Sequence, residues 1–155
     1  MEEFIYLPLY SRQGGIHVQE RSGLNQWNAN GRSRNSYEVY IPIPREVHNR
    51  YPGFFPDRDH PFRLQLPDGS IISAKICQEG EKALMSNPNS DLGRWIIPQI
   101  ESGSYELIDN QNTLITYQML ESAGIDSVRI TKECDNLYTI DIAPLHSYEI
   151  QMGRG

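Results

Sequence analysis

Short runs of β-branched and aromatic residues, separated by Gly, Pro, Asn and Asp, recur along the chain and constrain its fold most strongly. Branched and aromatic side chains favour strands, whereas the separating residues favour turns. Two short helices are predicted, over residues 44–51 and 116–124. Together with seven or eight strands they predict a mainly β barrel or sandwich. The predicted strands cover residues 4–10, 15–19, 37–44, 82–86, 126–132 and 136–143, with a hairpin over residues 62–78 around Asp68-Gly69.

Length and composition predict one globular domain. The chain has 155 residues, of which 38% are hydrophobic and 22% charged. Residues 1–150 are expected to form this domain and residues 151–155 a disordered tail. No apolar run approaches the roughly 18–20 residues of a membrane span, and the acidic start of the chain does not resemble a secretory signal. Cys77 and Cys134 are too far apart for a disulfide framework or a metal motif, which suggests a reduced, cytoplasmic protein.

Charge is distributed unevenly along the chain. The net charge of −6 argues against a nucleic-acid partner, because phosphate contacts come chiefly from Lys and Arg. Residues 1–96 are nevertheless balanced, with eleven basic and eleven acidic residues, whereas residues 97–155 hold three basic and nine acidic ones. Residues 11–50 contain six Arg against three Glu, and guanidinium groups suit phosphates and guanine edges. An uneven solvated surface is the commoner explanation, so charge alone is a weak pointer.

The residue groupings that catalysis needs are missing. Pro56-Asp57 and Pro67-Asp68 match the first half of an acidic magnesium-dependent nuclease motif, but the second half, Asp/Glu-x-Lys, does not occur. No His is followed two positions later by Lys, as a phospholipase D-like centre requires. There is also no nucleophile elbow, Gly-rich phosphate loop with Lys, or His/Cys metal spacing. The sequence therefore predicts no catalytic residue, metal or cofactor in this chain.

Two polar segments, each with a Trp among Asn and Arg, are the candidate binding elements. Residues 22–36 and 86–95 are both expected to be loops, and long ordered loops are usually functional. Asn and Gln can pair with adenine, Arg with guanine and acids with cytosine, although Asn, Gly and Ser also simply form turns. The candidate DNA contacts are Asn25, Gln26, Trp27, Asn28, Asn30, Arg32, Arg34 and Asn35 in the first segment, Ser86, Asn87, Asn89, Ser90, Asp91, Arg94 and Trp95 in the second, and Arg12, Arg21 and Lys82 to phosphates.

Three sequence blocks carry a family resemblance. SGLNQWNANGRSRNSYEVYIPIPREVH, FFPDRDHPFRLQLPDG and EKALMSNPNSDLGRW resemble the C-terminal DNA-binding domain of NgoAVII/BfiI-type restriction endonucleases, in the same order and over about residues 5–143. The resemblance implies an open, seven-stranded B3-like pseudobarrel flanked by two short α-helices. It also implies that an N-arm (residues 22–35) and a C-arm (residues 86–95) grip the duplex from its major-groove side and read a short asymmetric site.

The resemblance further implies a partner and a division of labour. The partner is double-stranded DNA, and cleavage belongs to a separate phospholipase D-like or other nuclease domain of the parent protein. From Ile96 onward the chain is more acidic than the family pattern, so no contact is expected beyond Trp95 and the final third should face away from DNA. Two other functions stay open: an effector module whose bound DNA controls cleavage elsewhere, and a carbohydrate- or small-ligand-binding β-barrel.

Overall fold

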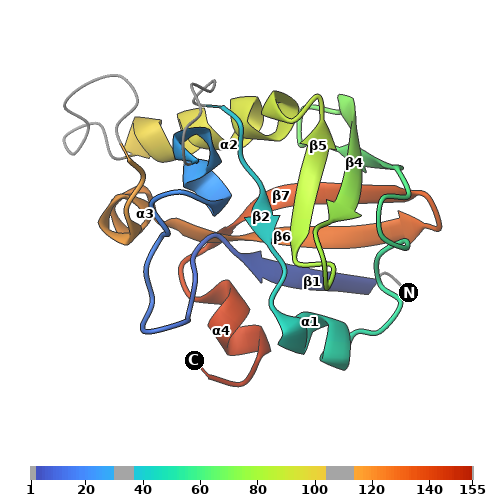
Figure 1. Cartoon of the computed structure of the whole chain (residues 1–155), viewed down its shortest axis with the longest axis horizontal. Helices are drawn as coiled ribbons and strands as arrows, with labels where there is room; N and C mark the ends of the chain where they lie inside the picture. The colour runs from blue at the N-terminus through green and yellow to red at the C-terminus, as the bar shows by residue number, and fades with distance from the viewer. Residues whose placement is uncertain (1–2, 30–36, 104–113, 155) are drawn as a thin grey trace.

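A seven-stranded sheet forms the centre of the computed structural model, which describes residues 3–29, 37–103 and 114–154 (Figure 1). The strand order is β1-β6-β7-β3-β4-β5-β2, and neighbours are antiparallel except for the parallel pair β3 and β7. β1 and β2, at the two ends of this order, lie next to each other, so the sheet is nearly closed. The predicted open, seven-stranded pseudobarrel is confirmed. The strands are β1 (Glu3–Pro8), β2 (Ile41–Pro42), β3 (Phe62–Gln65), β4 (Ile71–Cys77), β5 (Ala83–Asn87), β6 (Ile125–Cys134) and β7 (Leu137–Pro144).

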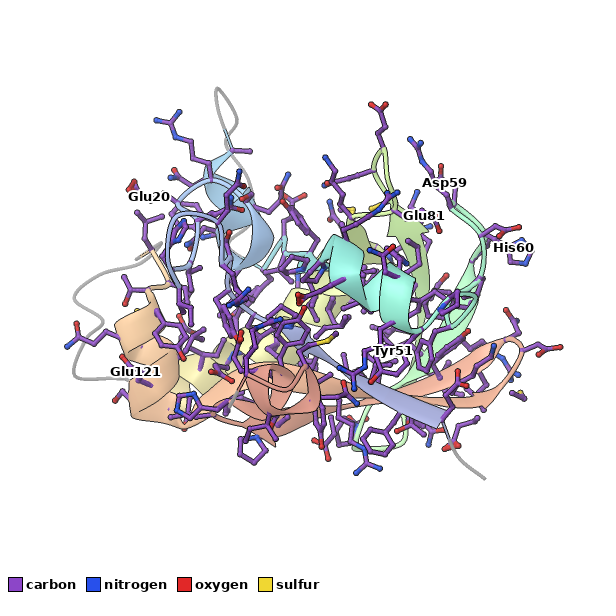
Figure 2. The ribbon with its side chains drawn as sticks, turned by 90° about the horizontal axis from the view of Figure 1, so that it is seen from below. Glu20, Tyr51, Asp59, His60, Glu81 and Glu121 are labelled. Carbon is purple, nitrogen blue, oxygen red and sulfur yellow. The ribbon has the colours of Figure 1, made fainter. Side chains whose placement is uncertain are left out.

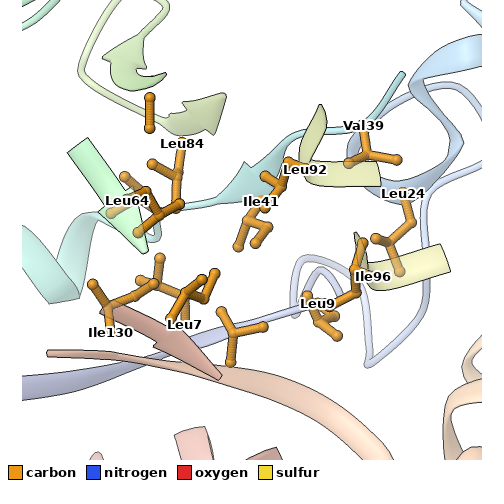
Figure 3. Packing of buried hydrophobic residues seen from close by; sticks show 14 of the residues in the cluster. Leu7, Leu9, Leu24, Val39, Ile41, Leu64, Leu84, Leu92, Ile96 and Ile130 are labelled. Carbon is orange, nitrogen blue, oxygen red and sulfur yellow. The ribbon is translucent and has the colours of Figure 1, made fainter. Parts of the chain in front are cut away.

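The apolar core lies inside this barrel. Alternate strand residues point inward, as the two-residue period requires, so Ile5 and Leu7 of β1 are fully buried. Their register partners in β6, Ile130 and Val128, are fully buried too. Figure 3 shows inward side chains from several strands meeting Leu24, Leu92 and Ile96 from outside the sheet, and all belong to one buried cluster. The loop after β1 and the helix after β5 are therefore anchored in the core.

Helices cover the barrel in greater number than predicted. The described residues form four α-helices and the 3-10 helix η1, rather than two short helices. α1 and α3 match the predicted pair, and α3 has the expected Thr116 cap and left-handed Gly124 stop. No described helix is long and apolar enough to cross a membrane. The bounds are η1 (Gly23–Asn28), α1 (Arg45–Arg50), α2 (Ser90–Gly103), α3 (Tyr117–Ala123) and α4 (Ser147–Gln151).

α2 corrects the prediction of a loop over residues 86–95. Ser, Asp and Gly in its first turn and Pro98 in its interior all disfavour a helix in a reading from propensity. Its helical period is nevertheless present, because Leu92, Ile96 and Ile100 recur every four residues and all three are fully buried. Burial of this apolar face outweighs the weak local propensity.

Two predicted strands are shorter than expected. Residues 37–44 do alternate, with Val39, Ile41 and Ile43 buried, but only Ile41–Pro42 pairs with β5. The prolines at positions 42 and 44 lack the N–H that a longer ladder needs. Within residues 15–19, pairing is limited to a single bridge between Ser11 and His17.

Residues 147–154 pack on the barrel. α4 lies against β1 and β6, and its Tyr148 is fully buried. Beyond α4, Arg154 donates to the carboxylates of Glu46 and Glu149. Residues 151–154 therefore do not form the predicted disordered tail. Glu46 lies 108 residues before Arg154, so local composition could not reveal this contact.

Candidate nucleic-acid interface

After β1, residues 9–29 project from the barrel, and residues 37–40 lead into β2 (Figure 1). The projecting segment begins with a tight turn closed by backbone hydrogen bonds between Ser11 and His17. Gly14 and Gly15 lie in this turn with φ of 78° and 110°, which glycine adopts without strain. η1 follows, and the Tyr40 amide donates to the Gly23 carbonyl, so the returning chain is tied to the outgoing one.

The described half of the predicted N-arm is η1. Gln26, Trp27 and Asn28 are partly exposed there, and the Asn28 amide donates to the Glu20 carbonyl over 3.1 Å. These three residues remain candidate contacts. The other predicted N-arm contacts, Asn30, Arg32, Arg34 and Asn35, lie outside the described residues.

Asn25 has a structural role instead of the predicted contact with DNA. Its side chain is fully buried. Nδ2 donates to the carbonyl oxygens of Gln19 and Ile115, and Oδ1 accepts the Ile115 N–H, all over 2.9 Å. The amide thus pairs with the Ile115 backbone as a neighbouring strand would. It attaches η1 to the chain before α3 and is not available to a base.

Ser86 is also a structural residue and not an exposed contact. It is 3% exposed, its Oγ accepts the Leu92 N–H over 2.9 Å, and its hydroxyl donates to the Pro88 carbonyl. The first amides of a helix have no partner within the helix, so Ser86 supplies one to the first turn of α2.

The remaining predicted C-arm residues lie at the end of β5 and the start of α2. Asn87 and Arg94 are exposed, whereas Asn89, Ser90, Asp91 and Trp95 are partly buried. The Arg94 guanidinium lies 5.3 Å from the centre of the Tyr37 ring. Beside it is a hollow of about 560 Å³ whose lining includes Asp68, Asp91, Asp141, Arg94 and Trp95. Its three carboxylates make this hollow a poor surface for phosphates.

A larger concave surface, here called the groove, lies between residues 11–22 and the β4–β5 turn, residues 78–82. It has a volume of about 710 Å³, and the junction of β2 and α1 forms its floor. Figure 2 shows Glu20 and Glu81, from the two flanking segments, on the same side of the molecule, with β6 and β7 on the opposite side. Its lining has one carboxylate, Glu46, and six basic or amide side chains: Arg12, Arg45, Lys82, Gln13, Gln19 and Gln78.

The β4–β5 turn is held firmly beside this groove. Gln78, Gly80 and Glu81 all have positive φ, which gives the turn its tight shape. His48 of α1 donates from Nε2 to the Glu81 carbonyl over 2.7 Å, and the Ile43 amide donates to the Lys82 carbonyl. The register Cys77–Ala83 and Ser73–Asn87 puts this turn and the predicted C-arm at opposite ends of β5.

Two carboxylates lie below the groove, Glu46 of α1 and Glu149 of α4. Through Arg154 and Arg12 they connect these two helices to the segment that begins at residue 10. Glu149 accepts from the Tyr10 hydroxyl over 2.6 Å and pairs with the Nε of Arg12 over 3.1 Å and of Arg154 over 2.8 Å. Burial raises the pKa of Glu149, but the hydrogen bonds from Tyr10 and Arg154 outweigh it, so its pKa is lowered overall. The hydrogen bonds from Arg154 lower the pKa of Glu46. Both carboxylates are therefore ionised at neutral pH.

The three predicted phosphate contacts all lie on this side of the molecule. Arg12 and Lys82 line the groove, and Arg21 is exposed on the adjoining surface next to residues 114–117. Arg45 and Gln78 also line the groove but are not predicted as contacts, because Arg45 falls at the start of a predicted helix and Gln78 at the end of a predicted strand hairpin. A signal was available, since residues 79–82 place three charged side chains in one turn. Within the described residues, no group of three His, Cys, Asp or Glu is placed to hold a metal.

Comparisons with known proteins identify the family. No curated protein matches the chain. Among solved structures, the N-terminal domain of Helicobacter pylori LlaJI.R1 is similar with a TM-score of 0.41 and 14% identity, over 74% of this chain and 84% of that one. The family model of the NgoFVII C-terminal B3-like DNA-binding domain matches residues 5–133. With its seven-stranded pseudobarrel, the chain belongs to the NgoFVII C-terminal family of B3-like DNA-binding domains.

Proposed function

We propose that this chain is the sequence-specific recognition domain of a restriction endonuclease. It binds double-stranded DNA in the groove and reads a short asymmetric site from the major-groove side. It performs no catalytic step, and cleavage belongs to a nuclease domain of the parent protein. Arg32 and Arg34 stay in the proposal as N-arm readers, because they continue the segment that flanks the groove.

The observation that carries this proposal is the groove itself. Two segments far apart in the sequence project on the same side and enclose a surface whose lining includes two Arg, a Lys and three Gln against one carboxylate, Glu46. Arg and Lys neutralise phosphates, and Arg and Gln can each pair bidentately with a base edge. Figure 2 shows the β6–β7 hairpin, which has four acidic and two basic residues, on the opposite side of the molecule from this surface, so the excess negative charge of the hairpin does not face bound DNA. Residues 86–95 contribute less in this arrangement, because they lie at the other end of β5.

The test combines site selection with substitutions on the two candidate faces. Selection of bound duplexes from a random pool should enrich one short asymmetric motif. Arg45→Ala and Lys82→Ala should then weaken binding to it, and each should lower the slope of log affinity against log salt by about 0.9. Arg63, which is exposed on β3 and absent from the groove lining, provides the matched control, since Arg63→Ala should leave the slope unchanged.

The same titrations distinguish the alternatives. If Arg94→Ala lowers affinity while Arg45→Ala and Lys82→Ala do not, DNA binds at the predicted C-arm and not in the groove. A pool that stays random would leave DNA binding without sequence specificity. Family membership favours DNA over the carbohydrate alternative. The effector alternative concerns the parent enzyme, and its cleavage rate should respond to a second site-bearing duplex added in trans.

A further inference from the structure

Residues 147–154 lie beyond the family match, which ends at residue 133, yet they reach the groove. Glu149 is 7% exposed and lies below Tyr10 and Arg12, which both line the groove. Arg154 is bound to it and also to Glu46, another groove residue. The contacts of Glu149 divide between its two oxygens in a way that bears on DNA binding.

Arg154 occupies one oxygen of Glu149. Its Nε donates to Oε1 over 2.8 Å, while its two Nη atoms donate to the two carboxylate oxygens of Glu46, each over 2.9 Å. This bidentate pair fixes the plane of the guanidinium, and the bond to Oε1 then fixes the rotation of the Glu149 carboxylate. Oε2 is left to the Tyr10 hydroxyl and to Arg12.

Arg12 approaches Glu149 through its Nε. The Nε to Oε2 distance is 3.1 Å, and the Arg12 side chain is 41% exposed. If Oε1 were vacant, the most favourable geometry would be a bidentate pair that uses both carboxylate oxygens and an Nη atom of Arg12. Because Oε1 already accepts from Arg154, we expect Arg12, which lines the groove, to keep its Nη atoms for an acceptor there.

We infer that Arg154 and Glu149 are positioning residues, which hold Arg12 so that its fork binds a pair of acceptor atoms on DNA. This inference rests on the proposed function. Guanine O6 and N7 and two phosphate oxygens offer the same paired acceptors. An oriented arginine loses less side-chain entropy on binding than a mobile one, so the positioning residues raise affinity without contacting DNA.

A double-mutant cycle tests the inference with the selected duplex and with a random duplex at several salt concentrations. Arg12→Ala should weaken binding, by roughly 5- to 150-fold if its fork contacts a guanine. Arg154→Ala should weaken binding several-fold in the wild-type background and have no effect in the Arg12→Ala background, because it acts through Arg12. Glu149→Gln provides a second, more conservative positioning variant with the same expected dependence on Arg12.

A guanine and a phosphate, the two possible sources of the paired acceptors, would give different patterns of affinity loss on the two duplexes. Loss confined to the selected duplex identifies a guanine, whereas equal loss on both duplexes with a salt slope smaller by about 0.9 identifies a phosphate. Tyr138→Phe controls for reduced stability: Tyr138 is fully buried, and its hydroxyl donates to the Phe54 carbonyl away from the groove. This variant should melt at a lower temperature and bind both duplexes as the wild type does.

The inference is overturned if Arg154→Ala has no effect on binding, or weakens it by the same factor in both backgrounds. Equal factors would mean that Arg154 affects binding independently of Arg12. Circular dichroism at the assay temperature confirms that each variant is folded. If the wild-type chain binds no duplex at all, the proposed function fails as well. Wild-type binding combined with equal losses overturns only the positioning role of Arg154 and Glu149.

Discussion

Asn25→Ala tests the physical explanation of how the N-arm is anchored. Asn25 is fully buried in η1, and its amide serves both the N–H and the C=O of Ile115, as well as the Gln19 carbonyl. Ile115 is 4% exposed, so its two backbone groups have little access to water once the Asn25 amide is removed. The exposed Gln19 can instead bind water through its carbonyl oxygen.

The expected loss of stability follows from these two backbone groups. Each buried, unsatisfied polar group costs about 1–3 kcal/mol, so with two such groups Asn25→Ala should lower the free energy of unfolding by about 2–6 kcal/mol. That is a large part of the roughly 5–15 kcal/mol that stabilises a typical domain. For a chain of this size the corresponding fall in Tm is about 4–24 °C.

Urea unfolding followed by circular dichroism measures this loss. Asn28→Ala is the matched control, because Asn28 belongs to the same 3-10 helix. The described hydrogen bond of its side chain, to the Glu20 carbonyl, is exposed to solvent. We expect the control to lose less than about 1 kcal/mol. If both variants lose the same amount, or if Asn25→Ala loses less than about 1 kcal/mol, burial of the Asn25 amide is not what anchors η1.

Two further predictions concern α2 and the carboxylates below the groove. Gly93→Ala should lower the free energy of unfolding, measured in urea, by at least about 3 kcal/mol. A Cβ at this position would lie 1.8 Å from the carbonyl oxygen of Tyr37, and a backbone atom cannot move aside alone. Near-wild-type stability would contradict that contact. The lowered pKa values of Glu46 and Glu149 mean that the folded state takes up protons less readily than the unfolded one. Their contribution to stability should be present in full above about pH 4.5, the ordinary pKa of a Glu side chain, and be lost as the pH falls through the lowered pKa values. In urea titrations at several pH values, the free energy of unfolding should therefore fall less steeply with acid for Arg154→Ala than for the wild type.

Local sequence patterns determined most of the strands, the hairpin turns and the ends of α3. The Asp68-Gly69 turn, the pairing of β6 with β7, and the Thr116 cap with the Gly124 stop involve neighbouring residues only, so sequence reasoning predicts them correctly. The family blocks also predicted the pseudobarrel and DNA as the partner, in agreement with the family match. α2 escaped prediction because the burial of its apolar face depends on the barrel, while its own residues suggest a loop.

Only the tertiary structure decided which polar residues are available to DNA. Asn25 and Ser86 look like base readers in the sequence, but each has a buried backbone partner, one of them 90 residues away. The groove joins residues 11–22 to residues 78–82, and Arg154 reaches Glu46 across 108 residues. Composition and spacing report on neighbours in the chain. Burial and hydrogen bonding between distant segments arise only when the barrel closes, and they determine whether a polar side chain faces the core or the surface proposed to bind DNA.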